Sequence, residues 1–140
     1  MKAAVVYWSG TGNTEAMANC VEEGAKDAGA EVQVFSASDF TADKVKKFDA
    51  IAFGCPSMGD EELEDSEFEP MFSDCEAELK GKKIALFGSY GWGDGEWMRK
   101  WEEVCKDLGV EFACDFVICN EEPDDEAKEA CKALGAALVK

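Results

Sequence analysis

The sequence contains no histidine, and none of its seven cysteines belongs to a C-x-x-C pair. Zinc and iron–sulfur sites are usually built from closely spaced cysteines, with histidine as the other common zinc ligand, so these two absences argue against a metal centre. An odd number of cysteines spread along the chain is also not typical of a disulfide framework. We therefore expect free thiols, most of them buried as small apolar side chains. The cysteines are Cys20, Cys55, Cys75, Cys105, Cys114, Cys119 and Cys131.

Long apolar runs are missing as well. No stretch approaches the roughly 20 apolar residues that a membrane-spanning helix needs, and the chain does not start with a basic, apolar signal sequence. With 140 residues, 46% of them hydrophobic, the chain can form one domain around one core. We therefore expect a single domain over residues 1–140 in a cytoplasmic protein that makes no membrane contact.

Positive charge is scarce. Lysine and arginine together number 14 against 31 aspartates and glutamates, for a net charge of −17. Such a field repels nucleic acid and anionic membranes and favours partners with a basic surface. Acidic side chains cluster in two loops, where they would steer a basic partner in a salt-dependent way; the alternative is that they only keep the protein soluble. We call this cluster the acidic rim: Asp60, Glu61, Glu62, Glu64, Asp65, Glu67, Asp94 and Glu96.

A polar, glycine-containing loop joins the first predicted strand, over residues 3–6, to a helix that begins near Glu15. The first turn of a helix presents unpaired N–H groups, and glycines let a ligand approach the backbone closely, so such a loop suits an anion. The loop has no lysine or arginine, which excludes a P-loop of the Lys-Ser/Thr type, and its glycine spacing is not the dinucleotide fingerprint. Two interpretations stay open: a terminal phosphate held by neutral dipoles, and ordinary capping of the helix by Ser9 or Thr11. The loop consists of Ser9, Gly10, Thr11, Gly12, Asn13 and Thr14.

Predicted strands and helices alternate along the whole chain. The strands lie over residues 3–6, 31–35, 48–55, 82–89 and 110–119. Of the five predicted helices, the first begins after residue 14, the second and third cover 38–47 and 68–79, the fourth follows the loop over 90–95 and ends near Leu108, and the fifth covers 124–138. Alternation of this kind predicts an α/β fold with a parallel sheet covered on both faces. The second strand alternates in polarity and suits an edge, whereas the third is apolar enough to be central. Ligands of such sheets bind at the carboxyl ends of the strands.

Two further loops at that edge contain unusual residues. The loop after the third strand includes Met58, and the loop after the fourth includes Trp92. A thioether and an indole can hold a flat ring between them, although each residue alone is more often part of a core. Their placement opposite an anion loop predicts a cavity for a ligand with a planar head and an anionic tail.

Four blocks of the sequence resemble the short-chain flavodoxins of clostridia and related anaerobes. They are YWSGTGNTE at 7–15, MGDE at 58–61, FEP at 68–70 and GKKIALFGSYGWGDG at 81–95. The resemblance implies a flavodoxin-like three-layer sandwich with strand order 2-1-3-4-5 and FMN as cofactor. It further implies a monomeric, low-potential one-electron carrier that uses the semiquinone/hydroquinone couple and serves a ferredoxin-like set of redox partners, rather than an enzyme.

The resemblance also assigns residues to the parts of FMN. The loop over 9–14 would cradle the phosphate, and Met58 and Trp92 would cover the two faces of the isoalloxazine. The Gly59 carbonyl would face N5, and the Glu61 side chain would accept a hydrogen bond from N3–H. The other cofactor-binding residues that it implies are Ser57, Asp60, Ser89, Tyr90, Gly91, Gly93, Asp94 and Asn120.

A one-electron carrier must stabilise the half-reduced flavin, which gains a proton at N5. We hypothesise that the peptide after Gly59 flips between type I and type II turn geometry, because glycine has no Cβ to oppose the flip. The flip would turn the Gly59 carbonyl toward N5, where it accepts a hydrogen bond from N5–H. One buried hydrogen bond contributes about 1 kcal/mol, which corresponds to about 40 mV for one electron. A small FMN-dependent reductase is the alternative function, although 140 residues leave little chain for a substrate pocket. A phosphoacceptor regulator would need acidic residues where Ser9, Gly10 and Thr11 stand.

Overall fold

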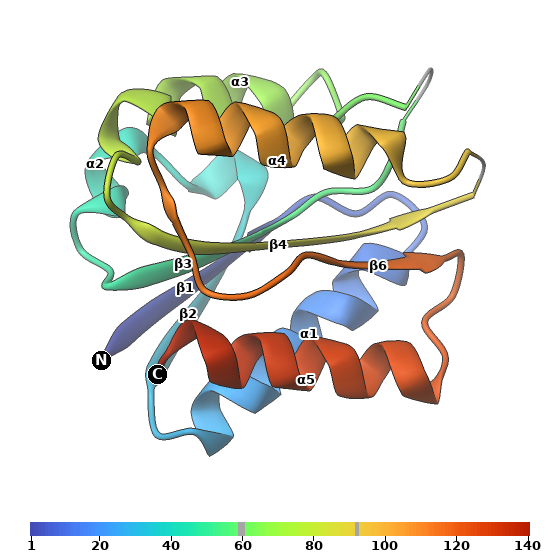
Figure 1. Cartoon of the computed structure of the whole chain (residues 1–140), viewed down its shortest axis with the longest axis horizontal. Helices are drawn as coiled ribbons and strands as arrows, with labels where there is room; N and C mark the ends of the chain where they lie inside the picture. The colour runs from blue at the N-terminus through green and yellow to red at the C-terminus, as the bar shows by residue number, and fades with distance from the viewer. Residues whose placement is uncertain (59–60, 92) are drawn as a thin grey trace.

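The structure, a computed structural model, describes residues 1–58, 61–91 and 93–140. Its strands are β1 Lys2–Tyr7, β2 Glu31–Ser36, β3 Ala50–Gly54, β4 Lys83–Tyr90, β5 Glu111–Phe112 and β6 Val117–Asn120; its helices are α1 Asn13–Asp27, α2 Ala42–Val45, α3 Phe68–Cys75, α4 Glu96–Leu108 and α5 Asp125–Leu138, with 3-10 turns η1 Ala37–Asp39 and η2 Glu76–Glu78. One face of the sheet is covered by α1 and α5, and the other by α3 and α4 (Figure 1). The three-layer α/β sandwich predicted from the alternation is therefore confirmed.

The strand order is β2-β1-β3-β4-β5, and every pairing is parallel. This is the order 2-1-3-4-5 that the resemblance implied. β2 lies at the edge, as its polar alternation predicted, and all five residues of β3 are buried at the centre. Because parallel strands all end at the same edge of the sheet, the loops after β1, β3 and β4 share one end of the molecule (Figure 1).

The predicted fifth strand over 110–119 is not continuous. Its two ends form β5 and β6, which both pair with β4. The register explains the break. Ile84 pairs with Phe112 and Phe87 pairs with Val117, so β4 advances three residues where the fifth strand advances five. Two surplus residues cannot join the ladder, and the chain leaves the sheet between Phe112 and Val117.

The predicted helix over 38–47 is also interrupted. The chain forms η1, turns at Phe40 with extended backbone angles of φ −103° and ψ 138°, and resumes as α2 at Ala42. The turn lets the Phe40 ring enter the core, where it is 3% exposed and lies 5.2 Å from the Phe35 ring and 6.3 Å from the Phe53 ring between centroids. Burial of a large aromatic side chain outweighs the weak preference for continuing a short helix.

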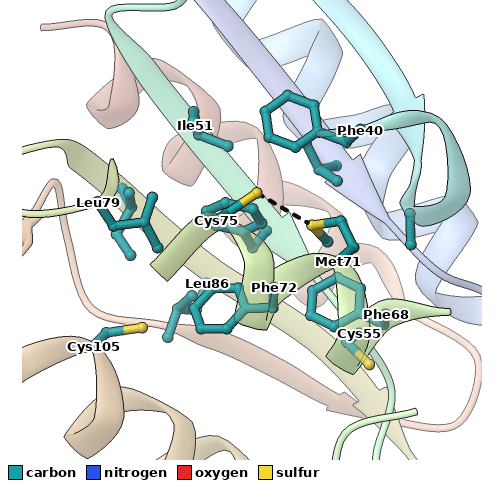
Figure 2. Close-up of a cluster of buried hydrophobic side chains, with 14 of the residues drawn as sticks. Phe40, Ile51, Cys55, Phe68, Met71, Phe72, Cys75, Leu79, Leu86 and Cys105 are labelled. Atoms are coloured by element: carbon teal, nitrogen blue, oxygen red, sulfur yellow. Dashed lines mark hydrogen bonds between the residues drawn. The ribbon is translucent and has the colours of Figure 1, made fainter. Parts of the chain in front are cut away.

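Strand alternation divides the core between the two faces of the sheet. Ala3 and Val5 point to the α1–α5 side, and Ala4 and Val6 to the α3–α4 side. On the latter side, Phe68, Met71, Phe72 and Cys75 of α3 pack over the sheet (Figure 2). All seven cysteines are free, as expected: Cys55, Cys75, Cys105 and Cys131 are buried, and Cys20, Cys114 and Cys119 are half-buried. In the described ranges no helix is long and apolar enough to cross a membrane.

Candidate functional site

A cavity of about 430 Å³ lies at the carboxyl ends of β1, β3, β4 and β6. This volume falls in the range of small-molecule and cofactor sites. Residues from all three loops predicted to meet at this edge line it. The lining residues are Trp8, Ser9, Gly10, Thr11, Asn13, Thr14, Pro56, Ser57, Met58, Ser89, Tyr90, Gly91, Glu121 and Glu122. The structure thus brings ten of the predicted site residues into one cavity.

The loop over 9–14 combines a helix cap with a set of unused donors. The Ser9 hydroxyl oxygen accepts the N–H groups of Gly12 at 3.1 Å and Glu15 at 3.2 Å. Gly12, at φ 94°, is the N-cap of α1 and has no side chain with which to cap it. In the described part of the chain, the N–H groups of Thr11 and Asn13 donate to no protein acceptor. Capping by Ser9 therefore coexists with free N–H groups on two residues that line the cavity.

A buried hydrogen bond joins this loop to β4. The hydroxyls of Thr14 and Ser89 lie 2.8 Å apart, and the two residues are 1% and 4% exposed. The Ser89 N–H also donates to the Thr14 hydroxyl at 3.4 Å. Because these groups satisfy one another, they fix the anion loop against the end of the central sheet. The Thr14 hydroxyl is committed to this bond, while Thr14 still lines the cavity.

At the other end of the cavity, the loop after β3 is closed by a short backbone ladder. The Met58 N–H donates to the Glu62 carbonyl at 2.8 Å, and the Glu62 N–H donates to the Met58 carbonyl at 2.9 Å. Met58 is 40% exposed and lines the cavity, so its side chain is accessible to a ligand there. The predictions for Gly59, Asp60 and Trp92 lie outside the described residues.

In addition to Gly12, four predicted site residues with described positions do not line the cavity: Glu61, Gly93, Asp94 and Asn120. Glu61 is 5% exposed and its Oε1 accepts the N–H groups of Asp94 and Glu96, both at 3.2 Å. Gly93 packs directly against that carboxylate. Asp94 itself pairs with Arg99 at 2.9 Å. The remaining one, Asn120, donates from its side chain to the Tyr90 carbonyl at 3.3 Å.

Four lining residues were missed by the sequence reasoning: Trp8, Pro56, Glu121 and Glu122. Trp8 and Pro56 could have been found, because each directly precedes a predicted site residue at the end of a strand. Glu121 is placed by its left-handed backbone, φ 56°, and by its N–H, which donates to the Tyr90 carbonyl at 2.7 Å. No local pattern in the sequence signals that conformation, because left-handed residues are usually glycine or asparagine.

Not all of the acidic rim faces solvent. Glu64 is 4% exposed and accepts the N–H groups of Glu67 and Phe68 at 2.8 Å each, as well as bonds from Ser66. Burial alone would raise the pKa of Glu64, but the hydrogen bonds from Ser66, Phe68 and Glu67 together hold the pKa below its usual value. Glu61 and Glu64 therefore act inside the fold, each at the start of a helix.

A sequence model of the flavodoxin family matches residues 5–134. The chain is 52% identical over 136 residues to a flavodoxin of Megasphaera elsdenii, covering 97% of each chain, and 46% identical over 135 residues to a flavodoxin of Clostridium beijerinckii, covering 96% and 97%. It is also similar to the solution structure of two-electron reduced Megasphaera elsdenii flavodoxin, with a TM-score of 0.90, 51% identity and 98% of each chain covered. A flavodoxin from the domain Archaea superposes with a TM-score of 0.87 at 33% identity, over 99% and 96% of the two chains.

Proposed function

This chain belongs to the flavodoxin family, and on that premise we propose that it binds FMN non-covalently and carries single electrons between redox proteins. The observation that carries the proposal is one cavity with unused backbone donors at one end and an exposed thioether at the other. FMN has the matching shape: a phosphate, a polar ribityl chain and a planar ring. When bound, FMN supplies a group that accepts and releases electrons one at a time.

The phosphate end is held by dipoles rather than by charge. The loop over 9–14 contains no cationic side chain, so the N–H groups of Gly10, Thr11 and Asn13 and the positive end of the α1 dipole supply the attraction. The Ser9 hydroxyl keeps these N–H groups in position by accepting from Gly12 and Glu15. A dianion bound in this way leaves the net charge of the protein strongly negative.

The ring end is held by Met58 on one face, with Trp92 proposed for the other. The Gly59 carbonyl is proposed to accept a hydrogen bond from N5–H, and the ladder between Met58 and Glu62 supports the turn that carries it. Because Met58 and Glu62 are bonded to each other, a change between them need not move β3 or α3. The role of these residues is to favour the half-reduced cofactor selectively.

The low potential of the second reduction step is proposed to come from nearby carboxylates. Glu121 and Glu122 line the cavity, and Glu62 stands at its edge beside Met58. At about 12 Å and an effective dielectric of about 40–80, each acid opposes an added negative charge by about 0.3–0.7 kcal/mol before salt screening. The same groups are proposed to steer ferredoxin-like redox partners with basic surfaces toward the cofactor, with the protein acting as a monomer.

Reconstitution with FMN tests the proposed function. The purified protein is expected to take up FMN, to show a flavin absorption spectrum and to be reduced in two separate one-electron steps. Failure to bind FMN, or reduction in a single two-electron step, would contradict the proposal. Turnover of NAD(P)H with a quinone would favour a reductase instead.

The phosphate cradle is tested separately with Ser9→Ala. Removing the Ser9 hydroxyl is expected to cost about 1 kcal/mol of FMN binding free energy, so FMN should bind about five- to tenfold more weakly. Riboflavin, which has no phosphate, is expected to bind the variant as well as it binds the parent protein. Ser73→Ala, at an exposed position of α3, serves as the matched control. An equal loss for both ligands would show that Ser9 does not act on the phosphate end.

A further inference from the structure

Glu61 links two loops that are distant in the sequence. Its Oε1 accepts hydrogen bonds from the backbone N–H groups of Asp94 and Glu96, both at 3.2 Å, across sequence separations of 33 and 35 residues. The side chain is buried, at 5% exposure, although glutamate is among the residues least often buried. Both donors are backbone N–H groups, so Glu61 supplies the only side chain in this link between the two loops.

These bonds supply a cap that α4 otherwise lacks. The N-cap of α4 is Gly95, which is left-handed at φ 98° and makes no side-chain cap. A carboxylate at this point satisfies N–H groups that the helix leaves unpaired and meets the positive end of its dipole. Glu61 is thus an N-cap supplied from another loop.

The tie is closely fitted and holds Glu61 in an unfavourable backbone conformation. A Cβ atom at Gly93 would lie 2.2 Å from the Glu61 Oε1, so only glycine leaves room for the carboxylate. Glu61 has φ 56°, a left-handed value that is unfavourable for a non-glycine residue. The hydrogen bonds to α4 offset this cost in the protein alone, before any ligand binds.

The two loops joined by Glu61 both line the cavity, and they begin side by side, where the Ser57 N–H donates to the Ser89 carbonyl at 3.0 Å. Met58, three residues before Glu61, lines one wall, and Tyr90 and Gly91, just before the bonded segment, line the other. Glu61 itself does not line the cavity. We propose that Glu61 is a positioning residue whose bonds to the start of α4 set the spacing of the two walls that receive the planar head of the ligand. The proposal rests on the proposed function for the identity of that ligand, and it concerns the bonds of Glu61 to the chain, not a bond to the flavin.

Glu64 offers a matched comparison within the same loop. It too is a buried carboxylate, 4% exposed, that caps a helix through backbone N–H groups. Its helix is α3, however, and its bonds stay within one segment, to Ser66, Glu67 and Phe68, instead of joining two loops. Removal of either carboxylate should cost stability, but only removal of Glu61 should move the cavity walls.

The test compares Glu61→Ala, Glu61→Gln and Glu64→Ala in the apoprotein and with two ligands. Backbone amide shifts and hydrogen exchange report the apoprotein, and titration reports the affinities for FMN and riboflavin. In Glu61→Ala we expect about tenfold faster exchange at Asp94 and Glu96 and shifted amides at Tyr90 and Gly91. FMN and riboflavin should both bind about tenfold more weakly, because the ring end is common to them. Glu61→Gln keeps an acceptor oxygen and should restore most of both effects.

Glu64→Ala should leave the amides of Tyr90 and Gly91 and the ratio of the two affinities unchanged. The proposal is overturned if the amides of Asp94 and Glu96 do not respond to Glu61→Ala. It is equally overturned if those amides respond while Tyr90, Gly91 and both affinities stay the same, or if FMN alone is affected. If the parent protein binds neither flavin, the proposed function fails, whereas the apoprotein amides still decide whether Glu61 sets the walls.

Discussion

The two faces of the sheet are packed in different ways. On the α1–α5 face, glycines bring backbone against backbone: a Cβ at Gly24 would lie 2.0 Å from the Lys132 carbonyl oxygen, and one at Gly135 would lie 2.1 Å from that of Val21. On the α3–α4 face, aromatic rings fill the space, with the Phe68 and Trp101 centroids 5.3 Å apart and edge to face. At these glycines α1 and α5 approach closely because no side chain lies between them, whereas the α3–α4 face is filled by large rings.

Each face positions a different part of the candidate site. The α1 helix starts at the anion loop, where the Thr14–Ser89 hydrogen bond joins the loop to the sheet, and close backbone packing at Gly24 and Gly135 joins α1 to α5. The α4 helix starts beside the ring end and is tied by side chains: the Trp97 indole N–H donates to the Cys55 carbonyl at 3.2 Å, and Glu61 caps its first turn. The comparison teaches that the helix beginning at the anion loop packs on its neighbour α5 through backbone contact, whereas the helix beginning at the ring end is held by replaceable side chains.

The largest effect is expected from Trp97→Ala on the aromatic face. Trp97 is 1% exposed, and deleting a buried tryptophan side chain typically costs about 3–5 kcal/mol of unfolding free energy. Urea denaturation of the apoprotein measures this loss. Trp97→Phe keeps much of the ring volume but not the bond to Cys55, and should lose less. A loss below 1 kcal/mol in Trp97→Ala would mean that side-chain packing does not hold α4.

A smaller loss is expected from Gly135→Ala on the glycine face. The new methyl group overlaps the Val21 carbonyl, and overpacking of this kind costs about 1–3 kcal/mol. Alanine also favours helix by about 0.5–1 kcal/mol, so the net loss tests the close approach directly. Ala133→Gly, at an exposed position of α5, measures that helix preference alone. A neutral or stabilising Gly135→Ala would remove the distinction between the two faces.

Glu64→Gln tests a tie made by charge on the aromatic face. A charged cap contributes about 0.5–2 kcal/mol, and the native pKa of Glu64 lies below its usual value. The Glu64 carboxylate therefore stabilises the fold fully above its pKa in the unfolded chain, about 4.3. This stabilisation is lost as the pH falls through the lower pKa that Glu64 has in the folded protein. The stability difference between the parent protein and Glu64→Gln should be constant near neutral pH and shrink in acid. A difference that grows in acid would contradict the lowered pKa.

The smallest effect concerns the thiols, which report packing on both faces without changing it. Burial raises the pKa of Cys105 on the aromatic face and of Cys131 on the glycine face to about 12 each. At pH 8 about one such thiol in 10⁴ is ionised, so both should react with a disulfide reagent far more slowly than the half-buried Cys114. In urea, all seven should react alike. Fast reaction of Cys105 or Cys131 in the native protein would show that the face holding it opens readily.

Much of this architecture could be predicted from local patterns. The apolar run over 50–54 predicts a central strand, and the polar alternation of 31–35 predicts an edge; both positions are confirmed. The stretch over 9–14 was expected to lie at the carboxyl edge, and five of its six residues line the cavity there. These features depend on side-chain periodicity and turn chemistry, which act over a few residues.

Other features depend on partners far away in the chain. Nothing near Glu61 indicates that its carboxylate would cap α4, and nothing near Glu121 indicates that it would turn back to Tyr90 and line the cavity. The break in the fifth strand follows from a register against β4 that places two extra residues outside the ladder.

The sequence by itself determined the alternating strands and helices, the cation-free loop and the acidic charge. Each of these is a property of neighbouring residues, and the four blocks at 7–15, 58–61, 68–70 and 81–95 together indicated the family. Only the tertiary structure decided which acids face solvent and which cap helices, and how the fifth strand meets its neighbour. The physical reason is that a buried carboxylate binds whichever backbone donors are left unpaired beside it, and packing of the whole chain chooses those donors.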